Sequence, residues 1–312
     1  MKIFDLHCDT IEALKKHGET FDNSTTQFTM KGQEKLEKAV QFLAVWLPDH
    51  LRGQEAVDFT NGYYEYMTEA LQKVSDRAAL VEDMSDLDTI LNERKWAFIR
   101  SIESGAALGG KLENVDHFAK LNFKMMTLTW NGINELGSGS QSEMGLTDFG
   151  KAVVRRMEKV GMVVDCSHLN DAGFEDLLNC SAKPFVASHS NLRALCSHSR
   201  NLRDDQFKEI VARGGLCGIN IYSKFLTEPD DLGAGQKEQL LRLIDRMLEL
   251  GGEDVIAWGM DLDGGVTCDP SIGTPYGAAA YGEYLVKHGI SRKVVDKLSF
   301  DNAYRFFTEN LS

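Results

Sequence analysis

The chain has 312 residues, enough for one large barrel or for two ordinary domains with an apolar core. Its 34 Lys and Arg against 47 Asp and Glu give a formal net charge of −13, which opposes a phosphate-binding surface and makes nucleic acid an unexpected partner. The first residues show no basic segment before a long apolar stretch, and apolar runs such as Phe42 to Leu47 cannot span a bilayer. We therefore expect a cytoplasmic protein without a membrane partner.

The 6 cysteines include no C-x-x-C pair and are too sparse for a secreted disulfide framework. We expect reduced thiols, as in a cytoplasm. Cys8 and Cys166 adjoin candidate metal ligands, so thiolate coordination is an alternative. Free cysteines are commonly buried and inert, and we expect that role for both.

Short apolar or β-branched runs alternate with amphipathic stretches along the whole chain, the pattern of βαβ units around a parallel sheet. We expect eight strands, at Lys2–Leu6, Gln41–Trp46, Trp96–Ile102, Lys124–Thr129, Met162–Cys166, Pro184–Ser188, Leu216–Asn220 and Val255–Met260. We expect helices at Ala56–Ser75, Phe149–Val160, Ala172–Asn179, Asp204–Ala212 and Lys237–Glu249, where apolar positions recur at three- and four-residue spacing. Eight strands with intervening helices predict a (β/α)8 TIM barrel.

No linker, repeat or low-complexity block divides the chain, so residues 1–312 are expected to form a single (β/α)8 barrel domain. The stretch Arg292–Leu311 predicts extra C-terminal helix packed against the barrel wall. Residues 131–144 and 222–235 are expected to be loops that shape a binding pocket.

Six candidate metal ligands follow the expected strands, at the carboxyl rim where active sites of such barrels lie. They are His7, Asp9, Glu103, His168, His189 and Asp261. Imidazole and carboxylate are the ligand set that suits zinc in a hydrolase. His7 and Asp9 lie two residues apart and can converge on one ion, and the two oxygens of Glu103 could bridge two ions. His198 also lies near this rim, and its role stays open.

The motifs around these residues resemble the renal or membrane dipeptidases, peptidase family M19. The matching segments are Asp5-Leu6-His7-Cys8-Asp9, Ile102-Glu103-Ser104-Gly105, Leu128-Thr129-Trp130-Asn131, Gly145-Leu146-Thr147-Asp148-Phe149-Gly150, Gly161-Met162-Val163-Val164-Asp165-Cys166-Ser167-His168, Ala187-Ser188-His189-Ser190, Ser199-Arg200-Asn201 and Gly259-Met260-Asp261-Leu262-Asp263-Gly264. The resemblance runs through most of the chain. It implies an amidohydrolase-like barrel, possible homodimers and zinc-dependent hydrolysis of dipeptides, including L,D-dipeptides.

The resemblance also implies roles for individual residues. It implies two Zn²⁺ ions per chain bridged by Glu103, with His7, Asp9 and Asp261 on one ion and His168 and His189 on the other. A metal-bridged hydroxide would attack the peptide carbonyl, and Asp261 would carry the proton to the leaving amine.

The family also holds its dipeptide with an Arg and a Tyr, and Arg200 and Tyr222 match that pattern. A planar guanidinium can grip the terminal carboxylate of a dipeptide through two hydrogen bonds. Mammalian members have a substrate-binding His where this chain has Trp130. An indole N–H donates one hydrogen bond and carries no positive charge, so we expect Trp130 to contact substrate and activity to be reduced or redirected.

Two other functions remain open. One is a related metal-dependent amidohydrolase that acts on a cyclic amide or lactone, although such enzymes often begin with His-x-His and use a carboxylated Lys, where this chain has His7-Cys8-Asp9 and Glu103. The other is a low-activity zinc-binding paralogue that binds peptides without turnover, an alternative that Trp130 keeps open.

Overall fold

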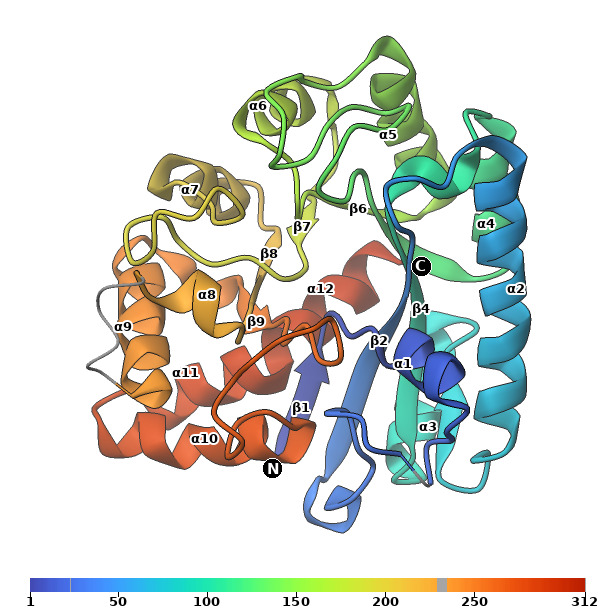
Figure 1. Cartoon of the computed structure of the whole chain (residues 1–312). Helices are drawn as coiled ribbons and strands as arrows, with labels where there is room; N and C mark the ends of the chain where they lie inside the picture. Colours follow the sequence, from blue (N-terminus) through green and yellow to red (C-terminus); the bar gives the residue numbers. More distant parts are fainter. Residues whose placement is uncertain (23, 229–234, 312) are drawn as a thin grey trace.

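The structure, a computed structural model, describes every residue except 23, 229–234 and 312. At its centre lies a ring of parallel strands (Figure 1). The hydrogen-bonded order is β2-β1-β9-β8-β7-β6-β5-β4, and β2 pairs again with β4 to close the ring. The strands are β1 (Lys2–Asp5), β2 (Lys38–Trp46), β3 (Ala78–Leu80), β4 (Trp96–Glu103), β5 (Phe123–Thr127), β6 (Val163–Asp165), β7 (Val186–Ala187), β8 (Leu216–Ile219) and β9 (Ile256–Trp258). The predicted TIM barrel is confirmed.

Strand β3 is a small addition that the sequence pattern did not predict. Ala78 to Leu80 pair with Trp96 to Phe98 at the start of β4, whereas β5 pairs with the end of β4, from Arg100 to Glu103. Both short strands therefore share one side of the long strand β4. Three residues are too few to show an alternating pattern, so the sequence does not predict β3.

Helices surround the ring, as Figure 1 shows. They are α1 (Thr10–His17), α2 (Gly53–Gln72), α3 (Leu87–Asn92), α4 (Glu113–Lys120), α5 (Asp148–Val160), α6 (Asp171–Cys180), α7 (Asp204–Ala212), α8 (Ser223–Leu226), α9 (Gln236–Glu249), α10 (Pro275–Lys287), α11 (Arg292–Asp296) and α12 (Asn302–Asn310). Each of the five predicted helices is present within three residues of its expected ends.

Helix α5 shows how local sequence sets these boundaries. The Thr147 hydroxyl accepts a hydrogen bond from the Gly150 amide and so caps the helix at its start. Gly161 ends it in the left-handed conformation, at φ 78°. The buried Val153, Val154 and Met157 recur at helical spacing and pack into the apolar layer between helices and strands.

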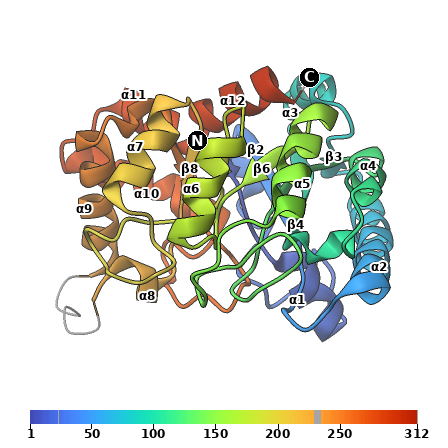
Figure 2. The same cartoon turned by 90° about the horizontal axis from the view of Figure 1, so that it is seen from above.

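Part of the C-terminal segment differs from its predicted position. Phe300 and Phe307 contact Phe4 of β1 at ring-centroid distances of 5.9 and 5.6 Å, within an apolar cluster that also holds strand residues Val40 and Ala97. Figure 2 shows α12 at one end of the barrel and α1 and α8 at the other. The residues from Phe300 onward therefore close the amino end of the barrel, because their aromatic side chains fill the apolar interior of the ring. Val294, Val295 and Leu298 pack in the outer apolar layer, so the first part of the segment lies along the barrel wall as predicted.

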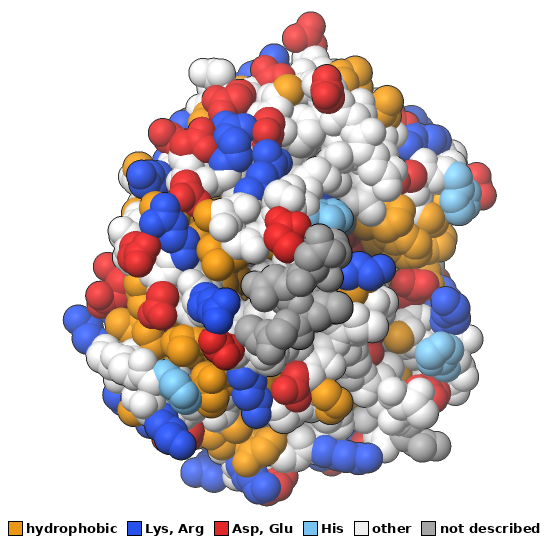
Figure 3. Space-filling view, turned by 60° about the vertical axis from the view of Figure 1, so that its left-hand side comes forward, with side chains coloured by type: hydrophobic (Ala, Val, Ile, Leu, Met, Phe, Trp, Pro, Cys, Tyr) orange, Lys and Arg blue, Asp and Glu red, His pale blue; other side chains and the backbone are white. Residues whose placement is uncertain are grey.

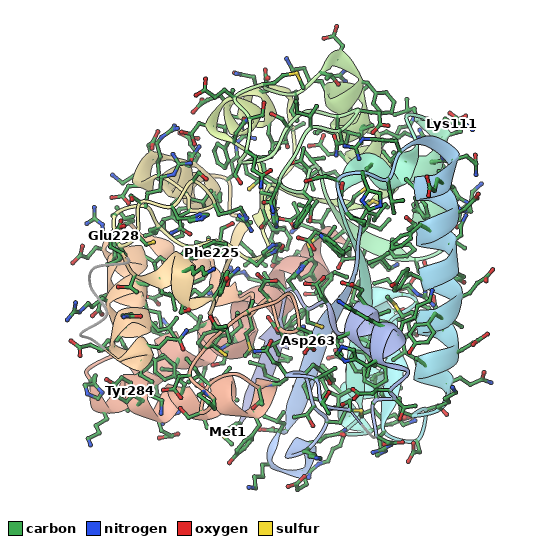
Figure 4. The ribbon with its side chains drawn as sticks, in the orientation of Figure 1. Met1, Lys111, Phe225, Glu228, Asp263 and Tyr284 are labelled. Carbon is green, nitrogen blue, oxygen red and sulfur yellow. The ribbon has the colours of Figure 1, made fainter. Side chains whose placement is uncertain are left out.

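The opposite end of the barrel carries the loops that follow each strand. Figure 4 labels two residues there, Phe225 of α8 and Asp263 of the loop after β9. On the face shown in Figure 3, acidic and basic side chains are interspersed. Among the described residues, no helix combines the length and the apolar character needed to cross a lipid bilayer.

Candidate metal centre

All six predicted ligands lie together at the carboxyl end of the barrel. His7 and Asp9 follow β1, Glu103 ends β4, and the remaining three lie in the turns after β6, β7 and β9. Five are buried, with His189 fully inaccessible, and the side chain of Asp261 is 14% exposed. These residues end or follow five separate strands, and they meet because the carboxyl ends of parallel strands lie at one rim of the barrel.

Glu103 occupies the middle of the group. Its Oε2 lies 3.4 Å from His7 Nε2, while its Oε1 lies 2.8 Å from His168 Nε2 and 3.6 Å from His189 Nε2. The two oxygens thus face different imidazoles. The six residues form three overlapping clusters, and within each cluster the donor atoms lie within 4.8 Å of one another. The clusters are His7/Asp9/Glu103, Glu103/His168/His189 and His7/His189/Asp261.

Hydrogen bonds at the far side of two imidazoles decide which nitrogen carries the proton. His168 Nδ1 lies 2.9 Å from Asn131 Oδ1, which only accepts, so Nδ1 donates and Nε2 has a free lone pair. His189 Nδ1 lies 2.7 Å from Ser188 Oγ. Burial lowers the pKa of His168 to about 4 and that of His189 well below its ordinary range, so both rings are neutral at pH 7.

The pKa values of two carboxyl groups in the site are also shifted, in the upward direction. Burial, reinforced by repulsion from Glu103, raises the pKa of Asp9 to about 8, and burial raises the pKa of Asp261 to about 6. His7 Nε2 and Asp9 Oδ1 are buried without a hydrogen-bond partner. Unpaired buried lone pairs and crowded carboxylates are costly unless a cation satisfies them. The donor set, imidazole nitrogen and carboxylate oxygen, therefore fits zinc.

The neighbouring cysteines do not enter the donor set. Cys8 Sγ donates to the carbonyl of Phe42, at 3.4 Å, and burial raises the pKa of both Cys8 and Cys166 well above its ordinary value. A thiol that stays protonated is a poor metal ligand.

The backbone is strained at two of the six positions. His168 and Asp261 adopt the left-handed conformation, at φ 71° and 62°, which costs free energy for residues other than glycine. Gly264 keeps the space in front of the carboxylates open, since a Cβ there would lie 2.5 Å from Asp261 Oδ1 and 2.6 Å from Asp9 Oδ2.

A cavity of about 490 Å³ opens over this group and is lined by Arg200, Tyr222 and Trp130. Arg200 is 6% exposed; its Nη2 donates to the carbonyl of His189 at 3.3 Å, and its Nε has no partner. His198, which the sequence left open, accepts a hydrogen bond from the Arg200 amide at 3.1 Å. The structure thus brings the predicted substrate residues to the metal ligands. Residues 229–234 of the predicted loop 222–235 lie outside the described part of the chain.

Several polar side chains of the site were not singled out from the sequence. Asn131 contacts His168, Ser188 contacts His189, and Asn220 donates to Asp261 Oδ2 at 2.8 Å. Helix α1 adds Glu12 and Lys16 to the cavity wall. Their positions in the sequence offered a signal, since Ser188 and Asn220 end predicted strands and Asn131 lies two residues beyond one.

The profile of one family matches residues 1–311, that of the membrane dipeptidases (peptidase family M19). The chain belongs to this family. It is therefore a metallo-dipeptidase by class, with a barrel whose buried His, Glu and Asp clusters are consistent with the family's binuclear metal site.

Relatives and solved structures agree with the family. The chain is 28% identical over 243 residues, 73% of this chain and 88% of the other, to the "Uncharacterized protein in pqqA 5'region" of Klebsiella pneumoniae. It superimposes with a TM-score of 0.91 and 23% identity on a metallopeptidase from Rhodobacter sphaeroides liganded with a phosphinate mimic of L-Ala-D-Ala, covering 100% of this chain and 99% of that one. A probable dipeptidase of Pseudomonas aeruginosa superimposes with a TM-score of 0.86 and 19% identity, over 100% and 96% of the two chains. At these identities the superpositions establish the fold.

Proposed function

We propose that this protein is a dinuclear zinc dipeptidase that hydrolyses L,L- and L,D-dipeptides. The central position of Glu103, with one oxygen toward His7 and the other toward His168 and His189, is the observation that carries the proposal. The L-Ala-D-Ala mimic bound by the Rhodobacter sphaeroides metallopeptidase supports the L,D class of substrate.

In this proposal, His7, Asp9 and Asp261 would hold one zinc, His168 and His189 would hold the other, and Glu103 would be shared between them. When bound, the ions would lower the pKa of water to about 7 and polarise the scissile carbonyl. The three imidazoles and three carboxylates offer nitrogen and oxygen donors without thiols, a set that suits a hydrolytic zinc site.

Asp261 is the proposed proton carrier. Its Oδ2 is held by Asn220 at 2.8 Å, which leaves Oδ1 toward the ligand group, 3.9 Å from His7 Nε2. This position allows the carboxylate to take a proton from water and release it to the leaving amine.

Arg200 and Tyr222 are proposed to bind the carboxyl end of the dipeptide. The guanidinium is buried at the cavity wall with an unpaired Nε, so it can donate to a carboxylate that enters. Trp130 packs edge to face against Trp46, with ring centroids 5.0 Å apart, and is proposed to contact the substrate with its ring.

The test is a panel of L,L- and L,D-dipeptides assayed with zinc-loaded, chelated and reconstituted enzyme. We expect hydrolysis that chelation abolishes and zinc restores, with about two zinc ions bound per chain. Well under one zinc per chain after reconstitution would overturn the metal assignment. Tight binding of dipeptides without product would instead identify a binding protein.

A further inference from the structure

A polar layer lies inside the barrel beneath the metal ligands. It consists of Thr127, Asp165 and Ser188, near the carboxyl ends of β5, β6 and β7. These residues are 2%, 0% and 0% exposed. On the same three strands, the residues two positions earlier are Met125, Val163 and Val186, which belong to the apolar interior cluster. The layer therefore separates the apolar interior from the ligands.

Asp165 is the hub of this polar layer. Its Oδ1 accepts hydrogen bonds from the backbone amides of Ser167 and Ser188, both at 2.9 Å. Its Oδ2 accepts from the hydroxyls of Thr127 at 2.7 Å and Ser188 at 2.5 Å. A carboxyl group with four donors around its two oxygens functions as an acceptor on both.

This arrangement fixes the direction of the next hydrogen bond. The single hydroxyl proton of Ser188 points to Asp165, so Ser188 Oγ accepts at its two other contacts, with Ser167 Oγ at 3.3 Å and with His189 Nδ1 at 2.7 Å. The proton of the neutral imidazole then lies on Nδ1. The lone pair of His189 Nε2 consequently faces Glu103 Oε1 at 3.6 Å and His168 Nε2 at 3.0 Å.

We infer that Asp165 and Ser188 are positioning residues that set the tautomer and orientation of His189 for metal binding. This inference rests on the proposed function. Groups that hydrogen-bond the far nitrogen of a ligating imidazole typically contribute 10- to 100-fold in metal affinity or activity. His168 has a direct partner, Asn131, whereas His189 depends on a two-step connection to a fully buried carboxylate.

Asp165→Asn tests the direction of the hydrogen bonds with little change in shape. The amide oxygen must stay at the two backbone N–H groups, which places the NH₂ group toward Ser188 Oγ. Ser188 Oγ then accepts a hydrogen bond from this NH₂ group and donates its own proton to His189 Nδ1. The His189 proton moves to Nε2, where it blocks the metal. Ser188→Ala is the second variant, because it removes the connection without adding a donor.

Thr127→Val is the matched control, since the Thr127 hydroxyl donates to the same oxygen of Asp165 and, among the described residues, forms no hydrogen bond to a ligand side chain. Each variant is titrated with zinc against a chelator, and 15N NMR reports the tautomer of His189 before zinc is added. We expect Asp165→Asn and Ser188→Ala to weaken one of the two zinc ions 10- to 100-fold, with Thr127→Val within about threefold of the wild type. We expect Nδ1 to carry the proton in the wild type and Nε2 in Asp165→Asn.

Wild-type zinc affinity in both variants, with an unchanged His189 tautomer in Asp165→Asn, would overturn the inference. An equal loss in Thr127→Val would also overturn it, because that result would indicate general packing. Failure of the proposed function is distinguishable, since a wild type that binds no zinc would still report the His189 tautomer by NMR.

Discussion

Trp130 lines the cavity over the metal centre, and its contacts indicate what the indole does. The ring packs against Trp46 at 5.0 Å and lies 6.3 Å from the imidazole of His168. We predict that Trp130→Ala raises KM about tenfold for dipeptides with large apolar side chains, because it removes an aromatic wall, with kcat nearly unchanged.

Trp130→Phe serves as the control for that prediction, since it keeps a ring but removes the N–H group. We expect it to stay within about threefold of the wild type in steady-state kinetics. A fall in kcat of about 10²-fold or more with constant KM would contradict this, and would identify the indole N–H as a donor to the transition state.

Asp261 is the second residue whose role kinetics can decide. We predict that Asp261→Asn retains most of its zinc, because five other ligands remain, but loses at least about 10²-fold in kcat, since an amide cannot carry the proton. Metal analysis and kcat measured on the same preparation check both parts. Turnover near the wild-type rate would remove Asp261 from the proton transfer.

At the scale of elements, helices α6 and α7 are linked through the first residue of α6. Asp171 accepts two hydrogen bonds from Arg193, both at 2.8 Å, and contacts Arg203 at 2.8 Å. Burial alone raises the pKa of Asp171, but the hydrogen bonds and charge of Arg193, together with hydrogen bonds from Arg203 and Gln206, lower it by more, so the net shift is downward. A carboxyl whose pKa is lower in the folded protein stabilises the fold above its unfolded pKa, about 3.9.

We therefore predict that Asp171→Asn lowers the free energy of unfolding at pH 7 by about 0.5–1 kcal/mol. The difference from the wild type should shrink as pH falls below about 4 and Asp171 becomes protonated in both states. Urea unfolding at several pH values measures this. A difference that is constant from pH 7 to pH 3 would show that the carboxylate charge is not the cause.

The C-terminal segment makes a second prediction at this scale. Phe307 is fully buried, 4.7 Å from Phe42 and 5.6 Å from Phe4 between ring centroids. Phe307→Ala should lower the free energy of unfolding by about 3–5 kcal/mol, because it leaves a cavity at the closed end of the barrel. The exposed Glu309→Ala on the same helix should change it by less than about 0.5 kcal/mol. Equal unfolding curves for the two variants would contradict this packing role.

At the scale of the whole molecule, the metal centre and the apolar core occupy different regions of the barrel. We predict that chelation lowers Tm by on the order of 5–10 °C, the shift expected when zinc is present at about 100 times its Kd. The far-UV circular dichroism should persist below that temperature, because the two apolar layers do not include the ligands. A Tm that does not respond to zinc would contradict the expected coupling of metal binding to stability.

The sequence by itself determined the barrel, the long helices α2, α5 and α9 together with α6 and α7, and the six candidate ligands. Each of these depends on local pattern, since strand and helix periodicities are local and His7, Asp9 and Glu103 lie at strand ends that the pattern marks. A parallel barrel then places all carboxyl ends at one rim, so the approximate position of the site follows from topology.

Tertiary structure alone decided which atoms face one another. The Asp165, Ser188 and His189 connection joins β6 to β7, and its hydrogen-bond directions depend on distances that no spacing along the chain encodes. The same holds for β3, whose three residues become a strand only by pairing with β4. It also holds for the C-terminal segment, whose aromatic residues pack into the apolar end of the ring only after the ring has formed. These features depend on contacts between distant segments, and such contacts exist only in the folded chain.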